Sequence, residues 1–506
     1  MKNKRKLKKA LIMSKPNTKF GEKMFCSVCP QNNEEKIVYG KIIEGEEGEI
    51  EQISILSKDM IEMDNDFFAR NSTQDVDEYH PYFCEFIIDH KIKMDKEIVK
   101  MLKKNVGKWL KIYILTEDNT GLKHDSIHGT LIFSASPIIR KGCYLKFDCI
   151  NFGEKLSEMS FYEKMKKQSL IKIINDYHEI DVSKIKNRFK EITEDLTSIE
   201  GYVYNVGQGN CIAMNLKNTF GYNRIFFDIG ESMLPNDENE EPFYIEQNET
   251  EIAKIKPSMV ILSHWDMDHI LGVHSLKDSV FDINNEDTRT YWIAPNLKML
   301  ANSMISVSAA RLCAYLVKSK SILMFDNKGE SSLVLESNDK KIKIYQGSGE
   351  ESANGIRNNI GLILTIEFSS RDNNKKHIDQ KFLFSGDCEY SKMHPEISAN
   401  PYDFIVSSHH GSKHAVLNEN GDEICLVNAQ GHAKAIVSCG YNTYNHPDVC
   451  HINALKNYGF KECLTIGSQW IKFEISNVKS LAVINYPNKK ERQRIDEKYL
   501  GKQNKS

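Results

Sequence analysis

The first part of the chain alternates short apolar runs with polar turns, at the length expected of β-strands. The runs lie at residues 37–39, 83–88, 109–115 and 129–133. Between them, the segment from Lys96 to Asn105 places apolar residues at helical spacing. Residues 23–153 are therefore predicted to form a small α+β or β-barrel-like domain. It follows a basic arm, residues 1–22, which has no apolar period and is predicted to be disordered.

Residues 154–198 are charged and carry apolar side chains at the mixed spacings of an α-helix. These side chains are Phe161, Met165, Leu170, Ile171, Ile173, Ile174, Phe189, Ile192 and Leu196. The segment is predicted to be a helical connector packed on one or both of its neighbours. A coiled coil is the alternative, but the heptad period is not sustained over the length that a coiled coil needs.

From Ile199 the pattern changes to short apolar strands broken by glycine and asparagine turns. Three strands end directly before histidine or aspartate clusters, at residues 259–262, 381–384 and 404–406. Strand ends that meet along one edge of a sheet form the crevice in which sites are built. Residues 199–487 are therefore predicted to form a two-sheet αβ/βα sandwich. Residues 298–319 predict one helix or two, and residues 488–506 a charged tail.

The composition adds two limits to this pattern. With 506 residues the chain is too long for one ordinary core, so two domains are expected. Its net charge of -3 neither demands nor excludes a nucleic-acid partner. Basic clusters from Lys2 to Lys9 and from Lys489 to Arg494 could bind phosphates, although solvated tails are the favoured interpretation.

Apolar runs and cysteines indicate the compartment. The run from Ala10 to Met13 is too short for a secretory signal, and no stretch approaches the roughly twenty apolar residues that span a bilayer. We therefore expect a cytoplasmic protein whose 12 cysteines are reduced thiols. The pair Cys26-x-x-Cys29 lacks a second pair at zinc-ribbon spacing, which favours ordinary thiols over a structural zinc site.

Side chains of metal-ligand type are concentrated directly after the predicted strand 259–262. Four of them fall within six positions: His264, Asp266, Asp268 and His269. Crowded carboxylates and histidines would cost free energy through like-charge repulsion, and a divalent cation removes that cost. The segment therefore predicts a metal centre at the end of this strand.

A set of short motifs accompanies this cluster along the chain. In order they are Asn205-Val206-Gly207-Gln208-Gly209-Asn210, Asp228-Ile229-Gly230, His264-x-Asp266-x-Asp268-His269, Gly386-Asp387, Ser408-His409-His410-Gly411-Ser412 and Asn445-His446-Pro447. The set resembles the metallo-β-lactamase superfamily and, within it, ComEC-type competence hydrolase domains, over about residues 199–487. Asp266 stands where the wider superfamily has histidine, as in ComEC-like members. Asn205 and Asn210 stand where the family has aspartate. The membrane channel of ComEC is absent, so transport is not implied.

The resemblance implies a four-layer αβ/βα sandwich that binds two divalent cations, zinc or manganese. His264 and Asp266 would hold the first cation, and Asp268, His269 and His409 the second, with Asp387 bridging both. The remaining ligand of the first cation stays open among Asn359, a water and His410. The extra carboxylate of Asp266 moves the preference from zinc toward manganese.

Three residues are expected to be catalytic: Asp268, His410 and His446. Asp228 is expected to orient a ligand histidine. The expected activity is metal-dependent hydrolysis by a metal-bridging hydroxide, as a phosphodiesterase or nuclease acting on DNA, RNA or a nucleotide. The alternatives are a hydrolase of small esters, lactones or thioesters, and a metal-binding scaffold without turnover. The N-terminal domain is expected to select substrate or bind a protein partner.

Overall fold

The computed structural model describes residues 19–29, 35–43, 50, 52–69, 81–88, 94–115, 126–134, 138–147, 172–177, 180–207, 209–219, 221–231, 256–273, 276, 289–300, 304–326, 332–337, 340–349, 356–371, 377–418, 420–424, 426–440, 446–465 and 470–476. The basic arm from Lys2 to Lys9, the tail 488–506 and Asn445 lie outside these residues. The chain divides into two compact units. Unit 1 comprises residues 1–177 with 301–319, and unit 2 residues 178–300 with 320–506. No helix in the described part of the chain is long and apolar enough to cross a membrane.

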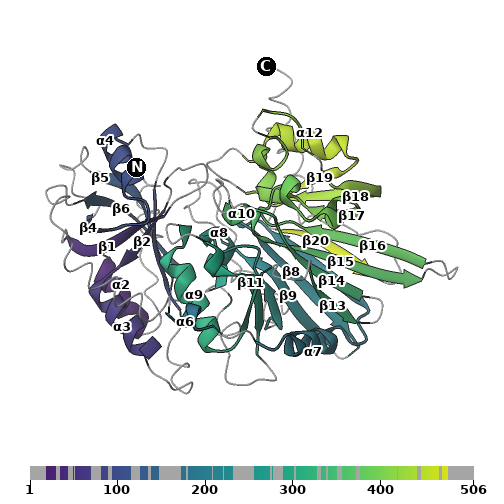
Figure 1. Ribbon diagram of the computed structural model, residues 1–506, viewed down its shortest axis with the longest axis horizontal. Helices are drawn as coiled ribbons and strands as arrows, with labels where there is room; N and C mark the ends of the chain where they lie inside the picture. Colours follow the sequence, from purple (N-terminus) through teal and green to yellow (C-terminus); the bar gives the residue numbers. More distant parts are fainter. Residues whose placement is uncertain are drawn as a thin grey trace, which may run out of the picture. The chain divides into compact units, whose positions relative to one another are not determined.

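Unit 1 is built on a closed barrel of six strands in the order β1-β2-β3-β5-β6-β4, all paired antiparallel (Figure 1). The strands are β1 (Lys36–Ile43), β2 (Gln52–Leu56), β3 (Phe83–Ile88), β4 (Trp109–Leu115), β5 (Ser126–Ser134) and β6 (Ile138–Phe147). Closure removes every unpaired sheet edge. The predicted strands and the barrel-like interpretation of this region are confirmed.

Helices accompany the barrel in unit 1. They are α2 (Lys19–Val28), α3 (Lys58–Ala69), α4 (Lys96–Lys104) and α6 (Lys172–Asn175). The predicted helix at residues 96–105 is α4, which begins where the Asp95 side chain accepts a hydrogen bond from the backbone of Glu97. Helix α2 begins at Lys19, inside the segment that we expected to be disordered up to residue 22. The difference follows from packing, because Met24, Phe25 and Val28 are buried and their burial stabilises the helix.

A helix from the middle of the chain completes unit 1. The segment 298–319, predicted to contain one helix or two, forms η9 (Leu297–Met299) and α9 (Val307–Lys318), and α9 groups with the barrel. Arg311 of α9 pairs with buried Asp64 of α3 at 2.9 Å and donates a hydrogen bond to the Tyr82 carbonyl at 2.8 Å. Its guanidinium carbon lies 3.9 Å from the centre of the Tyr82 ring.

The first turn of α9 is fixed by a buried carboxylate of the barrel. Glu85 accepts hydrogen bonds from the backbone and hydroxyl of Ser308, and another from Gln52. Burial raises the pKa of Glu85, although these hydrogen bonds work against the shift. The protonated form is therefore favoured by folding more than the charged form.

This raised pKa predicts a pH-dependent contribution of Glu85 to stability. A carboxyl group whose folded pKa is raised stabilises the protein fully below its ordinary value of 4.5, and the contribution is lost as pH rises through the folded pKa. Glu85→Gln should flatten this decline, because the amide does not ionise. The measurement is the free energy of unfolding of both proteins in denaturant at several pH values above 4.5. Parallel curves for the two proteins would contradict it.

Unit 2 contains two seven-stranded mixed sheets. The first has the order β12-β11-β10-β9-β8-β7-β20, and the second β13-β14-β15-β16-β17-β18-β19 (Figure 1). The strands of the first are β7 (Ser198–Tyr204), β8 (Cys211–Asn218), β9 (Gly221–Ile229), β10 (Met259–Ile261), β11 (Tyr291–Pro295), β12 (Ile322–Phe325) and β20 (Trp470–Ser476). Those of the second are β13 (Ser332–Ser337), β14 (Lys340–Gln346), β15 (Leu362–Arg371), β16 (His377–Phe384), β17 (Pro401–Val406), β18 (Asn428–Val437) and β19 (Lys461–Leu464).

One apolar core joins the two sheets of unit 2. It includes Ile225 and Phe227 of β9, Phe382 and Phe384 of β16, and Phe189 of α7 (Val182–Thr193). Side chains of a strand alternate between its two faces, so the sheets must face each other across this core. Unit 2 therefore has the mixed α/β fold that the sequence predicted.

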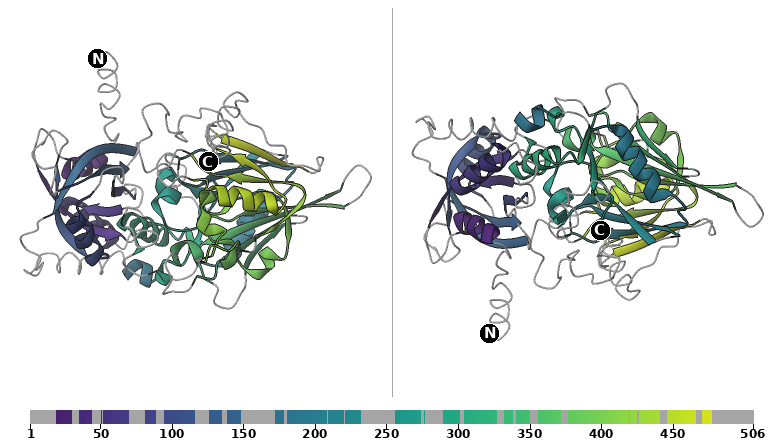
Figure 2. Two further views of the ribbon diagram at one scale, coloured as in Figure 1. Left: turned by 90° about the horizontal axis from the view of Figure 1, so that it is seen from above. Right: turned by 90° about the horizontal axis from the view of Figure 1, so that it is seen from below.

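A second core lies on the other face of the second sheet. It includes Leu383 and Ile405, which alternate with the residues of the first core, and Ile452 and Leu455 of α12 (Val449–Asn457). In the left view of Figure 2, α12 (yellow-green) lies against the second sheet, where it contacts β19. Both faces of the sheet are thus buried at the ends of β16 and β17, which accounts for the continuous apolar runs 382–384 and 404–406.

Candidate metal centre

The candidate residues lie in loops that follow parallel strands of unit 2. The motif Ser263–His269 follows β10 and enters the short helix α8 (Met267–Ile270). Asp387 follows β16, and His409 and His410 lie in η12 (Ser408–Gly411) after β17. Backbone hydrogen bonds join these loops, from Leu362 to the Ser263 carbonyl at 2.7 Å and from His409 to the Gly386 carbonyl at 3.0 Å. Segments far apart in the sequence therefore converge at one place.

Two glycines permit this close approach. A Cβ atom on Gly230 would lie 1.9 Å from the Asp268 carbonyl oxygen, a distance that no side chain tolerates. Gly386 has a φ of +53°, in the left-handed region, and a Cβ there would lie 2.5 Å from the Cβ of Ser263. The glycines of the Asp-x-Gly and Gly-Asp motifs are thus required by backbone packing against the first motif.

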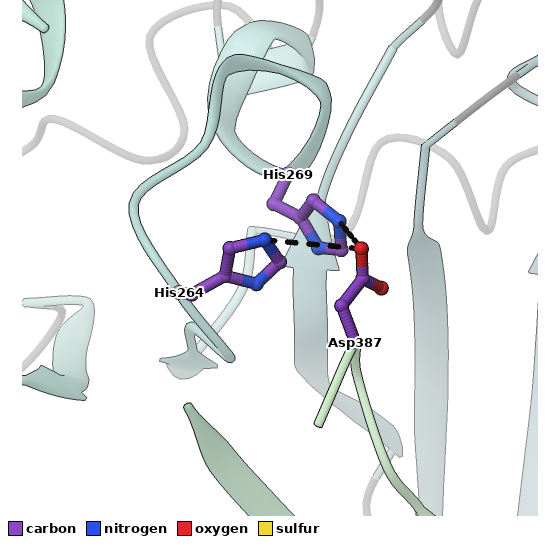
Figure 3. A group of neighbouring side chains, drawn as sticks. All are labelled: His264, His269 and Asp387. Carbon is purple, nitrogen blue, oxygen red and sulfur yellow. Dashed lines mark ion pairs between the residues drawn. The ribbon is translucent and has the colours of Figure 1, made fainter. Parts of the chain in front are cut away.

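Five candidate residues form two overlapping groups. His264, His269 and Asp387 make one group, and Asp268, His269 and His410 the other. Within each group the potential ligand atoms lie within 4.8 Å of one another, and all five side chains are buried. Figure 3 shows the imidazoles of the first group directed at the Asp387 carboxylate. The Nε2 atoms of His264 and His269 lie 3.9 and 3.4 Å from Asp387 Oδ2.

Hydrogen bonds set the same orientation for all three imidazoles. Nδ1 of His269 donates to Asp228 Oδ2 at 2.9 Å, and Nδ1 of His410 donates to the Ser438 carbonyl at 3.0 Å. The Ser263 hydroxyl donates to Asp228, so it accepts from Nδ1 of His264. With every Nδ1 engaged in these hydrogen bonds, each Nε2 faces the group, where a bound cation would take the place of a proton.

Three buried atoms at the centre of these groups make no hydrogen bond within the described structure. They are Nε2 of His269, Nε2 of His410 and Oδ1 of Asp387. Buried polar atoms without partners cost free energy, and their convergence calls for an explanation. Imidazole nitrogens and carboxylate oxygens are the ligand atoms that zinc, manganese and related cations bind. The residues present therefore fit a divalent cation.

The charges of the two carboxylates are unequal. Burial raises the pKa of Asp268. Burial also opposes ionisation of Asp387, yet His410, His269 and His409 hold the pKa of Asp387 well below its usual range. Burial lowers the pKa of His264, and the neighbouring His269 adds to this effect. The Asp387 carboxylate is thus charged at the centre of the cluster, and the His264 imidazole is neutral.

Other candidates lie around these groups and not within them. Asp266 contacts Arg357, with Oδ1 3.2 Å from Nη1, while its Oδ2 lies 3.8 Å from His264 Nε2. His409 Nε2 lies 3.9 Å from Asp387 Oδ2. The ring centre of His446 lies 6.0 Å from that of His409. Burial, with His409 and His410, lowers the pKa of His446 to about 3, so its imidazole is neutral at pH 7.

Asn359, one of the open choices for a cation ligand, has its side chain engaged elsewhere. Its Nδ2 donates to Glu389 Oε1 at 3.0 Å, and its Oδ1 accepts from the Glu389 backbone at 3.1 Å. His410, the other protein candidate, faces the centre. Sequence reasoning did not identify Arg357 or Ser263, because neither residue type signals a metal site by itself.

Asp228 anchors the first motif, as the sequence predicted for an orienting residue. Besides His269, it accepts hydrogen bonds from the Ser263 backbone at 2.6 Å and from Asn210 Nδ2 at 3.1 Å. Asn210 stands where the resembling family has aspartate, and here its amide supplies a proton donor to the Asp228 carboxylate. The departure from the motif thus removes a repulsion between two acidic side chains.

Left-handed backbone is concentrated at this site. Asp228, His409 and His410 have φ angles of 58°, 51° and 52°, although none is glycine. Such conformations cost about 1–3 kcal/mol each, and they persist where surrounding structure enforces them. Here the enforced conformations place Asp228 and the two histidines around Asp387.

Asp228→Asn should weaken metal binding without unfolding the protein. The amide keeps the shape but cannot accept from Ser263, Asn210 and His269 as the carboxylate does, so His269 loses its fixed orientation. Loss of such a partner lowers metal affinity roughly 10- to 100-fold. Competition with a chelator measures the effect. Unchanged metal affinity would show that Asp228 only stabilises the fold.

No protein-family model and no curated protein matches this chain. Solved structures that match part of this chain include a long-form RNase Z from yeast, at 13% identity and a TM-score of 0.31, covering 72% of this chain and 52% of the RNase Z. Yeast PDE1 is similar at 12% identity and a TM-score of 0.31, over 60% of this chain and 95% of PDE1. A diphosphatase of the PhnP family is similar at 11% identity and a TM-score of 0.30, over 56% and 100% of the chains.

Two further matching structures are metallo-β-lactamases, at TM-scores of 0.22 and 0.21. The chain spans about half the length of the yeast RNase Z.

Proposed function

We propose that this protein is a metal-dependent hydrolase that cleaves phosphodiester bonds in nucleic acid or a nucleotide at a two-cation centre. The observation that carries the proposal is the convergence of three buried atoms that have no hydrogen-bond partner within the described residues. They are His269 Nε2, His410 Nε2 and Asp387 Oδ1. Such a cluster is costly without a cation and chemically suited to one.

The distances support one assignment of ligands. His264 Nε2 and His269 Nε2 lie 3.9 and 3.4 Å from Asp387 Oδ2, and they would hold one cation with it. His410 Nε2 lies 3.4 Å from Asp387 Oδ1 and 3.9 Å from Asp268 Oδ2, and these three atoms would hold the other. Asp387 then bridges. This assignment adds His410 to the ligands that the sequence suggests. His409 Nε2, 3.9 Å from Asp387 Oδ2, and Asp266 Oδ2, 3.8 Å from His264 Nε2, lie close enough to complete the coordination.

The bound cations would supply a water activated at neutral pH and positive charge for the attacked phosphorus centre. The chain's own residues prepare the site for this chemistry. Asp228 and the Ser438 carbonyl fix two imidazoles in the orientation that presents Nε2. His446, neutral because burial lowers its pKa to about 3, can donate a hydrogen bond to a substrate oxygen.

Two further features support a phosphodiester substrate. The motif set resembles ComEC-type hydrolase domains, which implies action on nucleic acid. Phosphoryl transfer gains most from charge placed around several oxygens, which paired cations supply.

The test uses the full chain loaded with zinc or manganese. It is offered bis(4-nitrophenyl) phosphate, single-stranded DNA, RNA and a simple lactone, and its metal content is measured by elemental analysis. Metal-dependent turnover of a phosphodiester supports the proposal. Turnover of the lactone alone would replace it with a small-ester hydrolase, and bound metal without any turnover would indicate a scaffold.

A further inference from the structure

One wall of the barrel in unit 1 is basic and carries no carboxylate. In the barrel order, β5, β6, β4 and β1 are consecutive neighbours. Together these four strands contain six lysine or arginine residues and no aspartate or glutamate. The whole chain, in contrast, has 70 acidic and 67 basic residues. Positive charge gathered on one wall of a protein whose net charge is -3 indicates an anionic partner for that wall.

Strand pairing brings tyrosine and lysine side chains together on one surface of this wall. Ile37 of β1 pairs with Tyr113 of β4, and Tyr113 pairs with Lys146 of β6. Alternate residues of a strand share a face, which places the neighbours two positions away on the same surface. We call this surface the tyrosine face, and it consists of Ile37, Tyr39, Lys111, Tyr113, Tyr144 and Lys146.

The tyrosine face is the outer surface of the barrel wall. The residues that alternate with it, including Val38, Ile112 and Leu145, are 0% exposed and fill the barrel interior. Ile37 is 54% exposed, and the other members of the face are partly exposed. Helix α9 packs against β2 and β3, which lie across the barrel from β6 and β4 (Figure 1). The helix that covers one side of the barrel therefore leaves this wall uncovered.

Aromatic rings and ammonium groups lie next to one another on this wall. Lys111 Nζ lies 5.6 Å from the centre of the Tyr113 ring. His128 of β5 pairs with Tyr144, and the centres of their rings lie 4.9 Å apart. Single-stranded nucleic acid offers a matching pattern, because its bases present flat faces to aromatic rings and its phosphates attract lysine.

The rings distinguish this ligand from other polyanions. An acidic protein segment would satisfy the lysines but offers no flat face for each tyrosine. The bases of a duplex are stacked on one another, so their faces are closed to a protein surface. The combination of rings and positive charge therefore favours an unpaired strand over both.

We propose that the tyrosine face binds single-stranded nucleic acid. Tyr39, Tyr113 and Tyr144 stack on bases, and Lys111 and Lys146 contact phosphates. All five residues belong to unit 1, whereas the candidate cation ligands belong to unit 2. The inference goes beyond the proposed function, because it concerns binding alone and holds whether or not unit 2 cleaves phosphodiesters.

The first experiment measures binding to the full chain by fluorescence anisotropy. The probe is a labelled oligothymidylate of about 20 nucleotides, longer than the roughly 4 to 16 that single-strand-binding barrels cover. EDTA in the buffer stops metal-dependent cleavage. The protein should bind this probe, and it should bind the duplex with oligoadenylate at least about tenfold more weakly, since stacking is lost. Absence of binding at low salt, or equal affinity for the duplex, would overturn the proposal.

The second experiment tests stacking. Tyr113→Leu keeps an apolar side chain without the ring, and it should weaken binding about tenfold, the effect of one lost base stack. Tyr113→Phe keeps the ring and should keep the affinity. Tyr222→Leu is the matched control, because Tyr222 lies on β9 of unit 2 and is 41% exposed. Equal affinities of Tyr113→Leu and Tyr113→Phe would show that no base stacks there.

The third experiment tests the phosphate contacts. Lys111→Gln combined with Lys146→Gln should reduce the slope of log affinity against log salt by about 1.4, since each contact with a single strand contributes about 0.7. Lys217→Gln with Lys461→Gln, at exposed positions on strands of unit 2, should leave the slope unchanged. An unaltered slope in the first pair would overturn the proposal.

Two further outcomes separate this inference from its alternatives. If polyglutamate displaces the probe as well as unlabelled oligothymidylate does, the face recognises charge alone, as an acidic protein would supply, and the proposal is wrong. Turnover of bis(4-nitrophenyl) phosphate by the metal-loaded protein should be the same with and without the tyrosine-face substitutions. If the unmodified protein cleaves no phosphodiester, the proposed function fails, while the anisotropy titrations still decide whether the tyrosine face binds nucleic acid.

Discussion

Asp387→Asn should lower phosphodiester hydrolysis by roughly three to four orders of magnitude, corresponding to several kcal/mol of lost charge stabilisation. In the proposed assignment both Asp387 oxygens contact ligands, Oδ2 beside His264 and His269 and Oδ1 beside His410. Asparagine removes the charge and offers one oxygen, so both cations would be held more weakly. Elemental analysis and steady-state kinetics measure the two effects.

Asp379→Asn is the matched control for this change. Asp379 lies on β16, the strand that leads to Asp387, but its side chain is exposed and accepts a hydrogen bond from Ser369. The control should keep its metal and its activity. The circular dichroism of both variants should match that of the unmodified protein. Full activity in Asp387→Asn would show that the bridging role is wrong.

Arg311→Ala should lower the free energy of unfolding by about 3–5 kcal/mol, the usual cost of removing one partner from a buried ion pair. Asp64 is 4% exposed and Arg311 is fully buried. Without the guanidinium, Asp64 would remain as a buried charge, and the Tyr82 ring and carbonyl would lose their contact. Denaturant unfolding, followed by a probe in unit 1, measures the effect.

A paired variant separates loss of the charge balance from loss of packing. Asp64→Asn with Arg311→Met removes both charges and keeps much of the side-chain volume. It should be markedly more stable than Arg311→Ala alone. Arg188→Ala, on the partly exposed Arg188–Glu191 pair, should cost less than about 1 kcal/mol. A similar loss in all three proteins would contradict the buried-pair account.

Much of unit 2 was predictable because local signals agree there. The apolar runs at 381–384 and 404–406 became β16 and β17, and each is followed by the expected acidic or histidine residue. Parallel pairing of neighbouring strands then brings Asp387 and His410 to one edge. The positions of His264, Asp268 and His269 were predictable in the same way, because these residues follow the end of β10 in the first sheet.

The remaining details depend on contacts that a local pattern cannot encode. The contact of Asp266 with Arg357 joins segments about ninety residues apart, and nothing near either one signals the other. The directions of the His409 and His410 side chains depend on left-handed backbone at both residues, which the sequence does not reveal. Helix α9 has the ordinary spacing of an apolar helix, and this spacing does not indicate that the helix packs in unit 1.

The position of α9 determines which fragments of this protein contain a complete unit. The polypeptide passes between the two units three times, after residues 177, 300 and 319. A fragment that starts near Thr197 would carry α9 without Asp64 and Glu85, and a fragment that ends near residue 177 would keep those carboxylates without Arg311 and Ser308. A complete barrel unit is therefore not a contiguous stretch of the gene, and separate expression of it would require residues 301–319 to be supplied as a second polypeptide or grafted through a new linker.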